Sequence, residues 1–399
     1  MPVDSQLAFV LGGGGARAAY QVGVLRHIAS RYPDLAPGIL TGVSAGGIIA
    51  THLAARLGSF AESAARLSEL WLDLRIDKVF KVGPLGLGSR VTRWGTKLLS
   101  GGADTPRVRS LLDTSPLRDL LERTLRAESN GTVPGIARNL RAGRLDAVAL
   151  TASSYTTGQS VTWVEGREGC GRLAFEGPQR QSVGGCLRVD HVMASAALPF
   201  FFPAVQVEGA WYGDGGIRLT APLSPAIHLG ARRILAVSTR YPRTRAEAER
   251  PLVDGYPPPA QVAGVLLNAI FLDLLDADAE RLQELNALVD RLPEEARGGL
   301  QHIDLLVIRP SRDLGRLANE FEADLPRPFR FMVRGLGSRE TRSNDMLSLL
   351  MFQPDYIQRL VELGEADALA RSGEIDAFLG HGQATTIAGD GRPPDPPGA

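Results

Sequence analysis

Short apolar runs alternate with helical stretches along the first sixty positions of the chain. Leu7–Leu11 predicts a strand, and Ala18–Arg31 predicts the helix after it. The pattern then repeats, since Ile39–Val43 predicts a second strand and Ala45–Arg56 a second helix. This order is typical of a sheet covered by helices on both faces. We therefore predict an α/β fold with a mostly parallel sheet.

The later part of the chain continues the pattern. Leu145–Ser154 and Gln159–Glu165 are predicted to pair as strands around a Thr-Thr-Gly turn. Arg232–Thr239 and Ile303–Arg309 are apolar enough for buried strands of a parallel sheet. Between them, Gln261–Leu292 has apolar residues at helical spacing.

The composition changes along the chain in a way that predicts its organisation. Residues 59–144 are helical and punctuated by Gly and Pro, which predicts a cap or insertion in a catalytic unit over 7–228. Residues 229–379 are predicted to complete or extend that core. Residues 380–399 are polar and rich in Pro, so we expect a disordered tail.

Charge and hydrophobicity exclude several classes of protein. The 44 basic residues balance 44 acidic ones, so no field that attracts nucleic acid is expected. The N-terminus lacks the pattern of a secretory signal, and the longest apolar run, Val192–Val205, is too short to span a membrane. We expect a cytoplasmic protein in which Cys170 and Cys186 are free thiols, although they could bridge in an oxidising compartment.

Two glycine-rich turns follow the first two predicted strands and carry the first chemical signal. Gly42, Ser44 and Gly46 form a G-x-S-x-G pattern, in which small residues permit the sharp turn that exposes a nucleophilic serine. The other turn is the run Gly12, Gly13, Gly14 and Gly15. Its backbone N–H groups can stabilise an oxyanion. Both turns are expected at the carboxyl edge of the sheet, and together they indicate a serine acyl hydrolase.

Each motif also has a less specific interpretation. The serine could lie in an ordinary tight turn, and the glycine run could bind phosphate, although the G-x-x-x-x-G-K-[ST] pattern is absent. A serine nucleophile needs a base, for which His191, His228 and His302 are candidates. Asp214 is another candidate because three glycines surround it, although an Asp-Gly hairpin turn has the same composition.

Four sequence blocks, taken in order, resemble a known family. They are residues 9–17, residues 42–46, the Ala-Ser-Ala-Ala-Leu-Pro-Phe-Phe-Phe-Pro stretch at 194–203, and Tyr-Gly-Asp-Gly-Gly at 212–216. Their order and spacing are similar to those of patatin-like phospholipases. The resemblance covers residues 7–228 directly and the later residues more weakly.

This resemblance implies a three-layer patatin-like fold and a catalytic Ser-Asp dyad. Ser44 would be the nucleophile, Asp214 the base, and the N–H groups of the glycine run the oxyanion hole, with no histidine, metal or cofactor in the chemistry. The implied substrate is a phospholipid or lysophospholipid, reached by peripheral contact with a membrane. The supporting motif residues would be Arg17, Gly42, Gly46, Gly215 and Gly216.

Several finer points stay open at the level of sequence. After Arg17 the family often has glycine, whereas this chain has Ala18. The arginine could orient the loop, meet a phosphate headgroup or form a salt bridge. The phenylalanines at 200–202 could line an acyl channel or pack in the core. An acidic run lacks EF-hand spacing, and we expect it to be a solvated helix face: Asp273, Asp276, Asp278 and Glu280.

Two other functions compete with a dyad phospholipase. One is an esterase similar to the α/β-hydrolases, with a triad assisted by histidine. The other is a lipid-binding or partner-binding module without catalytic activity. It is disfavoured because a nucleophile, an acid and a glycine loop are all present.

Overall fold

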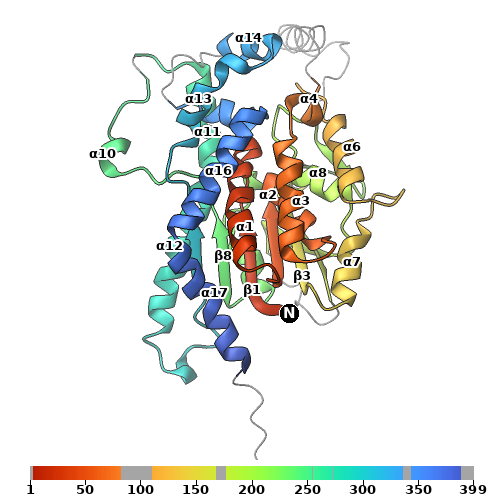
Figure 1. Cartoon of the computed structure of the whole chain (residues 1–399), viewed down its shortest axis with the longest axis vertical. Helices are drawn as coiled ribbons and strands as arrows, with labels where there is room; N and C mark the ends of the chain where they lie inside the picture. The colour runs from red at the N-terminus through yellow and green to blue at the C-terminus, as the bar shows by residue number, and fades with distance from the viewer. Residues whose placement is uncertain are drawn as a thin grey trace, which may run out of the picture.

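The computed structural model describes residues 3–81, 110–167, 177–253, 255–271, 273–335 and 343–387. Within them, a mixed sheet lies between layers of helices (Figure 1). Its strands are β1 (Asp4–Leu11), β2 (Pro37–Val43), β3 (Ala147–Ser154), β4 (Ser160–Gly166), β5 (Arg180–Gly184), β6 (Val205–Val207), β7 (Ala210–Asp214), β8 (Arg233–Val237) and β9 (Asp304–Ile308).

The helices before residue 230 are α1 (Ala19–Arg31), α2 (Ala45–Ala54), α3 (Phe60–Leu72), α4 (Ile76–Val79), α6 (Ser115–Thr124), α7 (Pro134–Arg141), α8 (Val189–Ser195) and α9 (Ser224–His228). Those after it are α10 (Arg245–Ala248), α11 (Pro259–Phe271), α12 (Asp273–Val289), α13 (Leu314–Glu320), α14 (Arg327–Gly335), α15 (Asp345–Leu350), α16 (Pro354–Ala370) and α17 (Ser372–Ile387). Short 3₁₀ turns include η1 (Gly15–Ala18) and η2 (Gly215–Ile217).

The strand order in the sheet is β5-β4-β3-β2-β1-β8-β9, with β7 paired to β3 and β6. Strands β3, β2, β1, β8 and β9 are parallel neighbours, whereas β4 and β7 run antiparallel to β3. Leu11, the last residue of β1, pairs with both Gly42 and Val237. The ends of the three central strands therefore meet at one edge, which confirms the predicted α/β class with a mostly parallel sheet.

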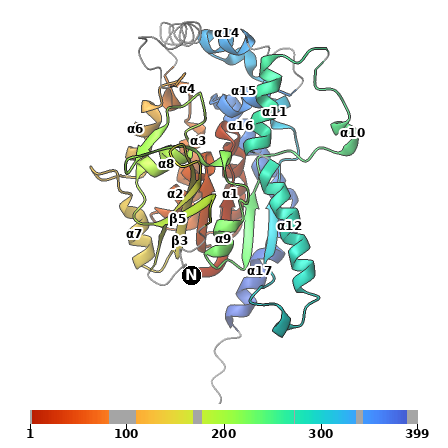
Figure 2. The same ribbon diagram turned by 180° about the vertical axis from the view of Figure 1, so that it is seen from behind.

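Alternating side chains of β1 build two separate cores. Leu7, Phe9 and Leu11 belong to a large apolar cluster with α1, α2, α3 and α16. Ala8 and Val10 belong to a second cluster with α9 and α12. Figures 1 and 2 show these two groups of helices on opposite faces of the sheet. Successive strand residues point to opposite faces, and a sheet buried on both needs apolar residues at every position.

Most predicted elements agree with the structure to within a few residues. Strands β5, β6 and β7 were not predicted, and the long helical stretch at 261–292 is divided into α11 and α12. Helix α17 runs on to Ile387, past the tail boundary predicted at 380. Residues 82–109 of the predicted cap, residues 388–399 of the predicted tail and Cys170 lie outside the described residues, and Cys186 is a free, exposed thiol.

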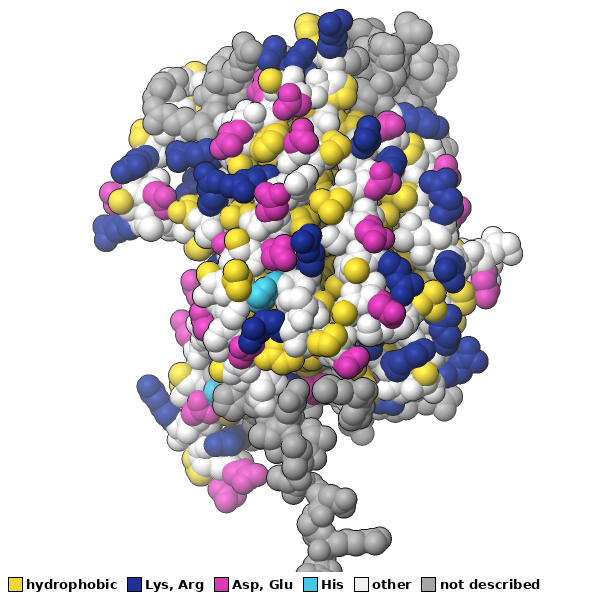
Figure 3. All heavy atoms as spheres, viewed as in Figure 1, with side chains coloured by type: hydrophobic (Ala, Val, Ile, Leu, Met, Phe, Trp, Pro, Cys, Tyr) yellow, Lys and Arg dark blue, Asp and Glu magenta, His cyan; other side chains and the backbone are white. Residues whose placement is uncertain are grey.

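The surface is mixed in charge on the face shown in Figure 3, where Lys and Arg side chains alternate with Asp and Glu. This agrees with the balanced composition of the chain. No helix in the described ranges combines the length and hydropathy needed to cross a bilayer.

Helices α1 and α16 cross at two glycines, where their backbones are in contact. A Cβ at Gly23 would lie 2.0 Å from the Val361 carbonyl oxygen, and one at Gly364 would lie 2.1 Å from the Tyr20 carbonyl oxygen. This crossing fixes α1, the helix that follows the glycine run, against the C-terminal part of the chain.

We predict that Gly23→Ala lowers the free energy of unfolding by about 1–3 kcal/mol, because overpacking outweighs the better helix propensity of alanine. The matched control is Gly380→Ala in α17, where a Cβ would meet no atom within 4 Å. That variant should be neutral or more stable by up to about 1 kcal/mol. Urea unfolding of both variants checks this, and equal stability of the two would contradict the close crossing.

Candidate active site

Ser44 lies at the sharp turn between β2 and α2. Its φ of 56° and ψ of −132° are unusual for a residue with a side chain. The turn is closed by two glycines, because a Cβ at Gly42 would lie 2.5 Å from the Gly46 carbonyl oxygen, and one at Gly46 would lie 2.1 Å from that of Leu11. The strained serine is thus held between β1 and its own helix, as a nucleophile elbow requires.

A second serine supports the elbow from α8. The Ser44 backbone N–H donates to Ser195 Oγ at 3.0 Å, and Ser195 Oγ donates to the Thr151 carbonyl at 2.7 Å. Ser195 is completely buried. It belongs to the 194–203 block, in which no sequence pattern predicts this contact. The block therefore fixes the backbone of the elbow to β3.

The glycine run passes directly beside Ser44, since a Cβ at Gly13 would lie 3.2 Å from Ser44 Cβ. The Gly12 carbonyl accepts from Gln21 Nε2 at 2.7 Å, and the Gly13 carbonyl accepts from Thr239 Oγ1 at 2.8 Å. In a trans peptide the C=O and the next N–H point in opposite directions. The N–H groups of Gly13 and Gly14 are therefore turned away from these partners, and no hydrogen bond among the described residues uses either as donor.

Asp214 ends β7, the strand that pairs with the outer half of β3. It has no solvent exposure, and its Oδ1 accepts from the Gly216 N–H at 2.9 Å. Oδ2 is buried and has no partner of normal hydrogen-bond geometry within the described ranges. The next residue, Gly215, is pressed against the elbow, because its Cβ would lie 2.1 Å from the Thr151 carbonyl oxygen and 2.7 Å from Val43 Cγ2.

Burial raises the pKa of Asp214 to about 7, because a carboxylate is poorly solvated in this position. The nearby Ser44 hydroxyl and the Gly216 N–H favour the ionised carboxylate, so they lower the pKa and oppose part of this rise. The serine and the aspartate, 170 positions apart (214 − 44) in the sequence, are therefore neighbours. A carboxyl with a pKa near neutrality is suited to accept and return a proton.

The three candidate histidines have other partners. His191 packs against Trp163 with ring centroids 4.6 Å apart and accepts from the Arg188 N–H, and burial lowers its pKa to about 4. His228 bonds within its own helix, and His302 pairs with acids on the surface. Within the described ranges, no hydrogen bond, ion pair or ring contact joins any of these histidines to Ser44 or Asp214.

An apolar cavity opens at Ser44. The glycine run and the elbow form one end of it, and helices α3, α6 and α15 form its walls. Of the phenylalanines at 200–202, Phe202 lines the cavity, whereas Phe200 is 70% exposed. The lining residues are Gly14, Gly15, Ser44, Ala45, Ile48, Leu70, Trp71, Leu74, Val79, Leu117, Leu120, Leu121, Ala196, Leu198, Phe202, Leu349, Leu350 and Phe352.

Two other predictions about polar residues can be compared with the structure. Arg17 forms a buried salt bridge with Asp345 in α15, so of its three open roles the salt bridge is the one observed. The acidic run is not a solvated face throughout. Asp276 is buried between Arg240 and Arg309, and Asp278 accepts from a backbone N–H. No group of potential metal ligands is found in the described ranges.

The sequence profile described as "Patatin-like phospholipase" matches residues 9–227, more than half of the 399 residues. The chain therefore belongs to the patatin-like phospholipase family. All four blocks singled out in the sequence lie within the matched region, which also contains Ser44 and Asp214. A search of curated proteins finds no match.

Similar solved structures include VipD from Legionella pneumophila, with 14% identity over 97% of this chain and 76% of that one, at a TM-score of 0.34. Human GIVD cytosolic phospholipase A2 has 12% identity over 96% and 60%, at 0.45. The type III effector ExoU, from Pseudomonas aeruginosa, has 13% identity over 93% and 54%, at 0.35. The chain spans less than two thirds of the length of the last two proteins.

The raised pKa of Asp214 predicts a pH-dependent cost to stability. Because the folded state holds this proton more tightly than the unfolded state, stability falls as pH rises from about 4 to 7. Asp214→Asn removes the titration, so its stability relative to wild type should increase by roughly 2–3 kcal/mol between pH 5 and pH 8. Urea unfolding at both pH values measures this. A difference that stays constant with pH would contradict the raised pKa.

Proposed function

We propose that this protein hydrolyses the carboxylic ester bonds of lipids, as a phospholipase A or lysophospholipase. The observation that carries the proposal is the strained Ser44 beside a buried carboxyl whose pKa is raised to about 7, at one end of an apolar cavity. Membership in the patatin-like phospholipase family supports the same reaction.

In the proposed first step, Ser44 Oγ attacks the ester carbonyl carbon and its proton passes to Asp214. The carbonyl oxygen becomes an oxyanion, which the N–H groups of Gly13 and Gly14 stabilise. When the tetrahedral intermediate collapses, the bond to the alcohol breaks and the alcohol leaves with the proton from Asp214. An acyl-serine remains.

In the second step, a water molecule attacks the acyl-serine carbonyl while Asp214 accepts its proton. Collapse of this intermediate returns the proton to Ser44 Oγ and releases the fatty acid. Asp214 acts first as a base and then as an acid in each half of the reaction, which is why a pKa near neutrality suits it. Atoms and charge balance without a metal or cofactor.

The cavity favours a lipid acyl chain over a small polar ester. Its walls are formed almost entirely by Leu, Ile, Val, Trp and Phe side chains, which bind alkyl chains by excluding water. Many of them come from α3 and α6, inside the segment 59–144. We therefore propose that this segment is a cap on a catalytic domain at 7–228 that sets substrate preference, and that residues 229–379 complete the core.

A long-chain phospholipid resides in a bilayer, so this function requires the protein to meet a membrane surface. We propose that it does so peripherally, from the cytoplasm, with a phospholipid or lysophospholipid as its lipid partner. A histidine-assisted esterase is less well supported, because the recorded contacts of the three candidate histidines lie elsewhere.

We predict that Ser44→Ala lowers fatty-acid release from phosphatidylcholine vesicles at least roughly a thousandfold. Three controls test the competing base: His228→Ala, His302→Ala, and His191→Asn, which keeps an acceptor for the Arg188 N–H. All three should stay within about twofold of wild type. Loss of turnover in one folded histidine variant would favour a triad, and undiminished release by Ser44→Ala would exclude this serine as the nucleophile.

The rate should also depend on pH through Asp214. Because the ionised carboxyl accepts the proton, kcat/KM for an uncharged ester should rise about tenfold per pH unit below 7 and level off above it. A profile that is flat from pH 5 to pH 8, or that falls as pH rises, would be inconsistent with Asp214 as the base.

A further inference from the structure

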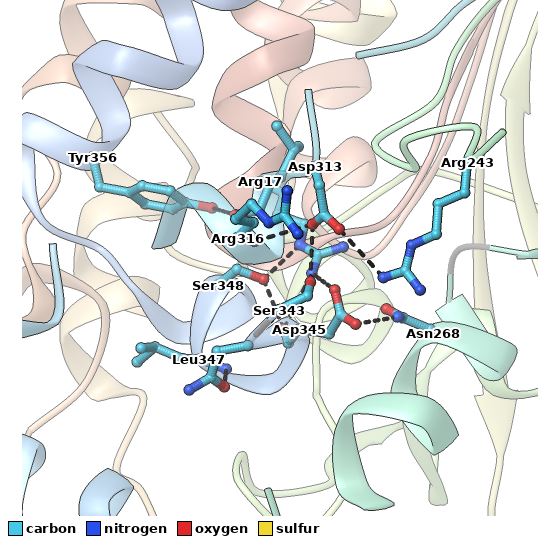
Figure 4. A network of polar contacts seen from close by, with 12 residues as sticks. Arg17, Arg243, Asn268, Asp313, Arg316, Ser343, Asp345, Leu347, Ser348 and Tyr356 are labelled. Carbon is cyan, nitrogen blue, oxygen red and sulfur yellow. Dashed lines mark hydrogen bonds and ion pairs between the residues drawn. The ribbon is translucent and has the colours of Figure 1, made fainter. Parts of the chain in front are cut away.

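A polar network that includes the buried Arg17 joins α15 to the turn that follows the glycine run (Figure 4). Arg17 is in η1, immediately after the run, and its side chain is 3% exposed. Its Nε donates to Ser348 Oγ at 2.6 Å, and its Nη2 donates to Asp345 Oδ1 at 2.5 Å. Both acceptors belong to α15, more than 300 positions later in the chain and outside the region matched by the family profile.

Helix α15 is itself fixed from other directions. Asp345 Oδ2 accepts from Asn268 Nδ2 of α11 at 2.6 Å. The Asn344 side chain accepts from the Leu347 N–H and so caps the helix. On a third side the backbone of α13 is in close contact, because a Cβ at Gly315 would lie 2.6 Å from Asp345 Oδ1. Asp345 is therefore a rigid acceptor for the arginine.

The same helix also touches the glycine run and the cavity. A Cβ at Gly15 would lie only 2.2 Å from the Leu349 carbonyl oxygen, so the backbones of η1 and α15 are in contact. Leu349 and Leu350 then line the cavity at Ser44. One short helix thus holds Arg17, limits the position of Gly15 and forms part of the wall for the acyl chain.

A glycine-rich loop needs such restraints in order to act as an oxyanion hole. Glycine has the greatest backbone freedom of any residue, and N–H donors stabilise a developing charge best when they are already in place. Hydrogen bonds from Gln21 and Thr239 hold the beginning of the run. The contacts of Arg17 hold its end.

We propose that Asp345 and Ser348 are positioning residues for the oxyanion hole, which they fix in place through Arg17. Neither lines the cavity at Ser44, so they act through the arginine and the loop. This inference rests on the proposed function, because it assigns the loop the role of binding the oxyanion. It predicts that the C-terminal part of the chain helps to hold the oxyanion loop in place.

The test is the kinetics of Asp345→Asn and Ser348→Ala in the full-length chain. Poorly placed N–H donors stabilise the transition state less, while binding of the ester itself changes little. We therefore expect kcat to fall at least about tenfold in Asp345→Asn and about threefold in Ser348→Ala, with KM within twofold of wild type. Affinity for an alkyl boronic acid, which becomes tetrahedral on Ser44, should fall by the same factor as kcat. A merely structural role would not link these two quantities.

The matched control is Asp146→Asn, which removes another buried carboxylate paired with an arginine, Arg167, beside the opposite ends of the strands. It should leave kcat and boronic acid affinity unchanged.

Because Asp345→Asn leaves the buried Arg17 without a counter-ion and is expected to reduce stability, circular dichroism and thermal unfolding accompany each assay. Ser348→Ala keeps the ion pair and decides the question if Asp345→Asn does not fold.

Wild-type kcat and boronic acid affinity in folded Asp345→Asn or Ser348→Ala would overturn this inference and leave the proposed function intact. A rise in KM alone, with kcat unchanged, would also overturn it. That result would mean that these residues shape the wall of the cavity and do not position the oxyanion hole. If Ser44→Ala hydrolyses lipid as wild type does, the proposed function fails and this inference fails with it.

Discussion

Contact between backbones at the carboxyl edge of the sheet is the constraint on which the site depends. The elbow can close only because positions 42 and 46 are glycines. The neighbouring backbone, including the end of β1, leaves no room for a Cβ at Gly42 or Gly46. That closure holds Ser44 at a positive φ and keeps it beside the glycine run. A second close contact, between Gly215 and β3, brings the end of β7 to the same place. These glycines are needed because the geometry of the site is made by main chain against main chain, where any side chain would separate the parts.

Burial of Asp214 has two opposite consequences, one for stability and one for the reaction proposed here. Asp214 is fully buried, which raises its pKa, whereas the Ser44 hydroxyl and the Gly216 N–H lower it and no cation contributes. Its ionised form is therefore disfavoured, and the folded state becomes less stable as pH rises, but the same effect gives the carboxyl a pKa suited to proton transfer. Arg17 is also buried, but it has a carboxylate partner in Asp345. One charge is left uncompensated where chemistry is proposed, and the other is neutralised where rigidity is needed.

The sequence predicted the elements whose signal is local. Strands β1 and β2 are continuous apolar runs, and the turns after them have glycines at fixed offsets, so the edge of the sheet could be predicted before the structure. Strand β5 was missed because its exposed, polar positions resemble a loop, and β6 and β7 because they are short and form a hairpin at the margin. The partners of Arg17 and the arginines that surround Asp276 could not be predicted, since each pairing joins positions far apart in the chain and only the fold decides which acid meets which base. The role of Ser195 could not be predicted either, because its hydroxyl accepts from the backbone N–H of Ser44, which is far away in the sequence.

The proposed function requires that Ser44 is an activated nucleophile whose base is Asp214. The most direct measurement is the rate of covalent labelling by a fluorophosphonate, with the modified peptide identified by mass spectrometry, in wild type and in folded Asp214→Asn. We expect labelling of wild type at Ser44 and a loss of at least about a hundredfold in the rate for Asp214→Asn. Labelling of Asp214→Asn at the wild-type rate, or labelling of wild type at a residue other than Ser44, would contradict it.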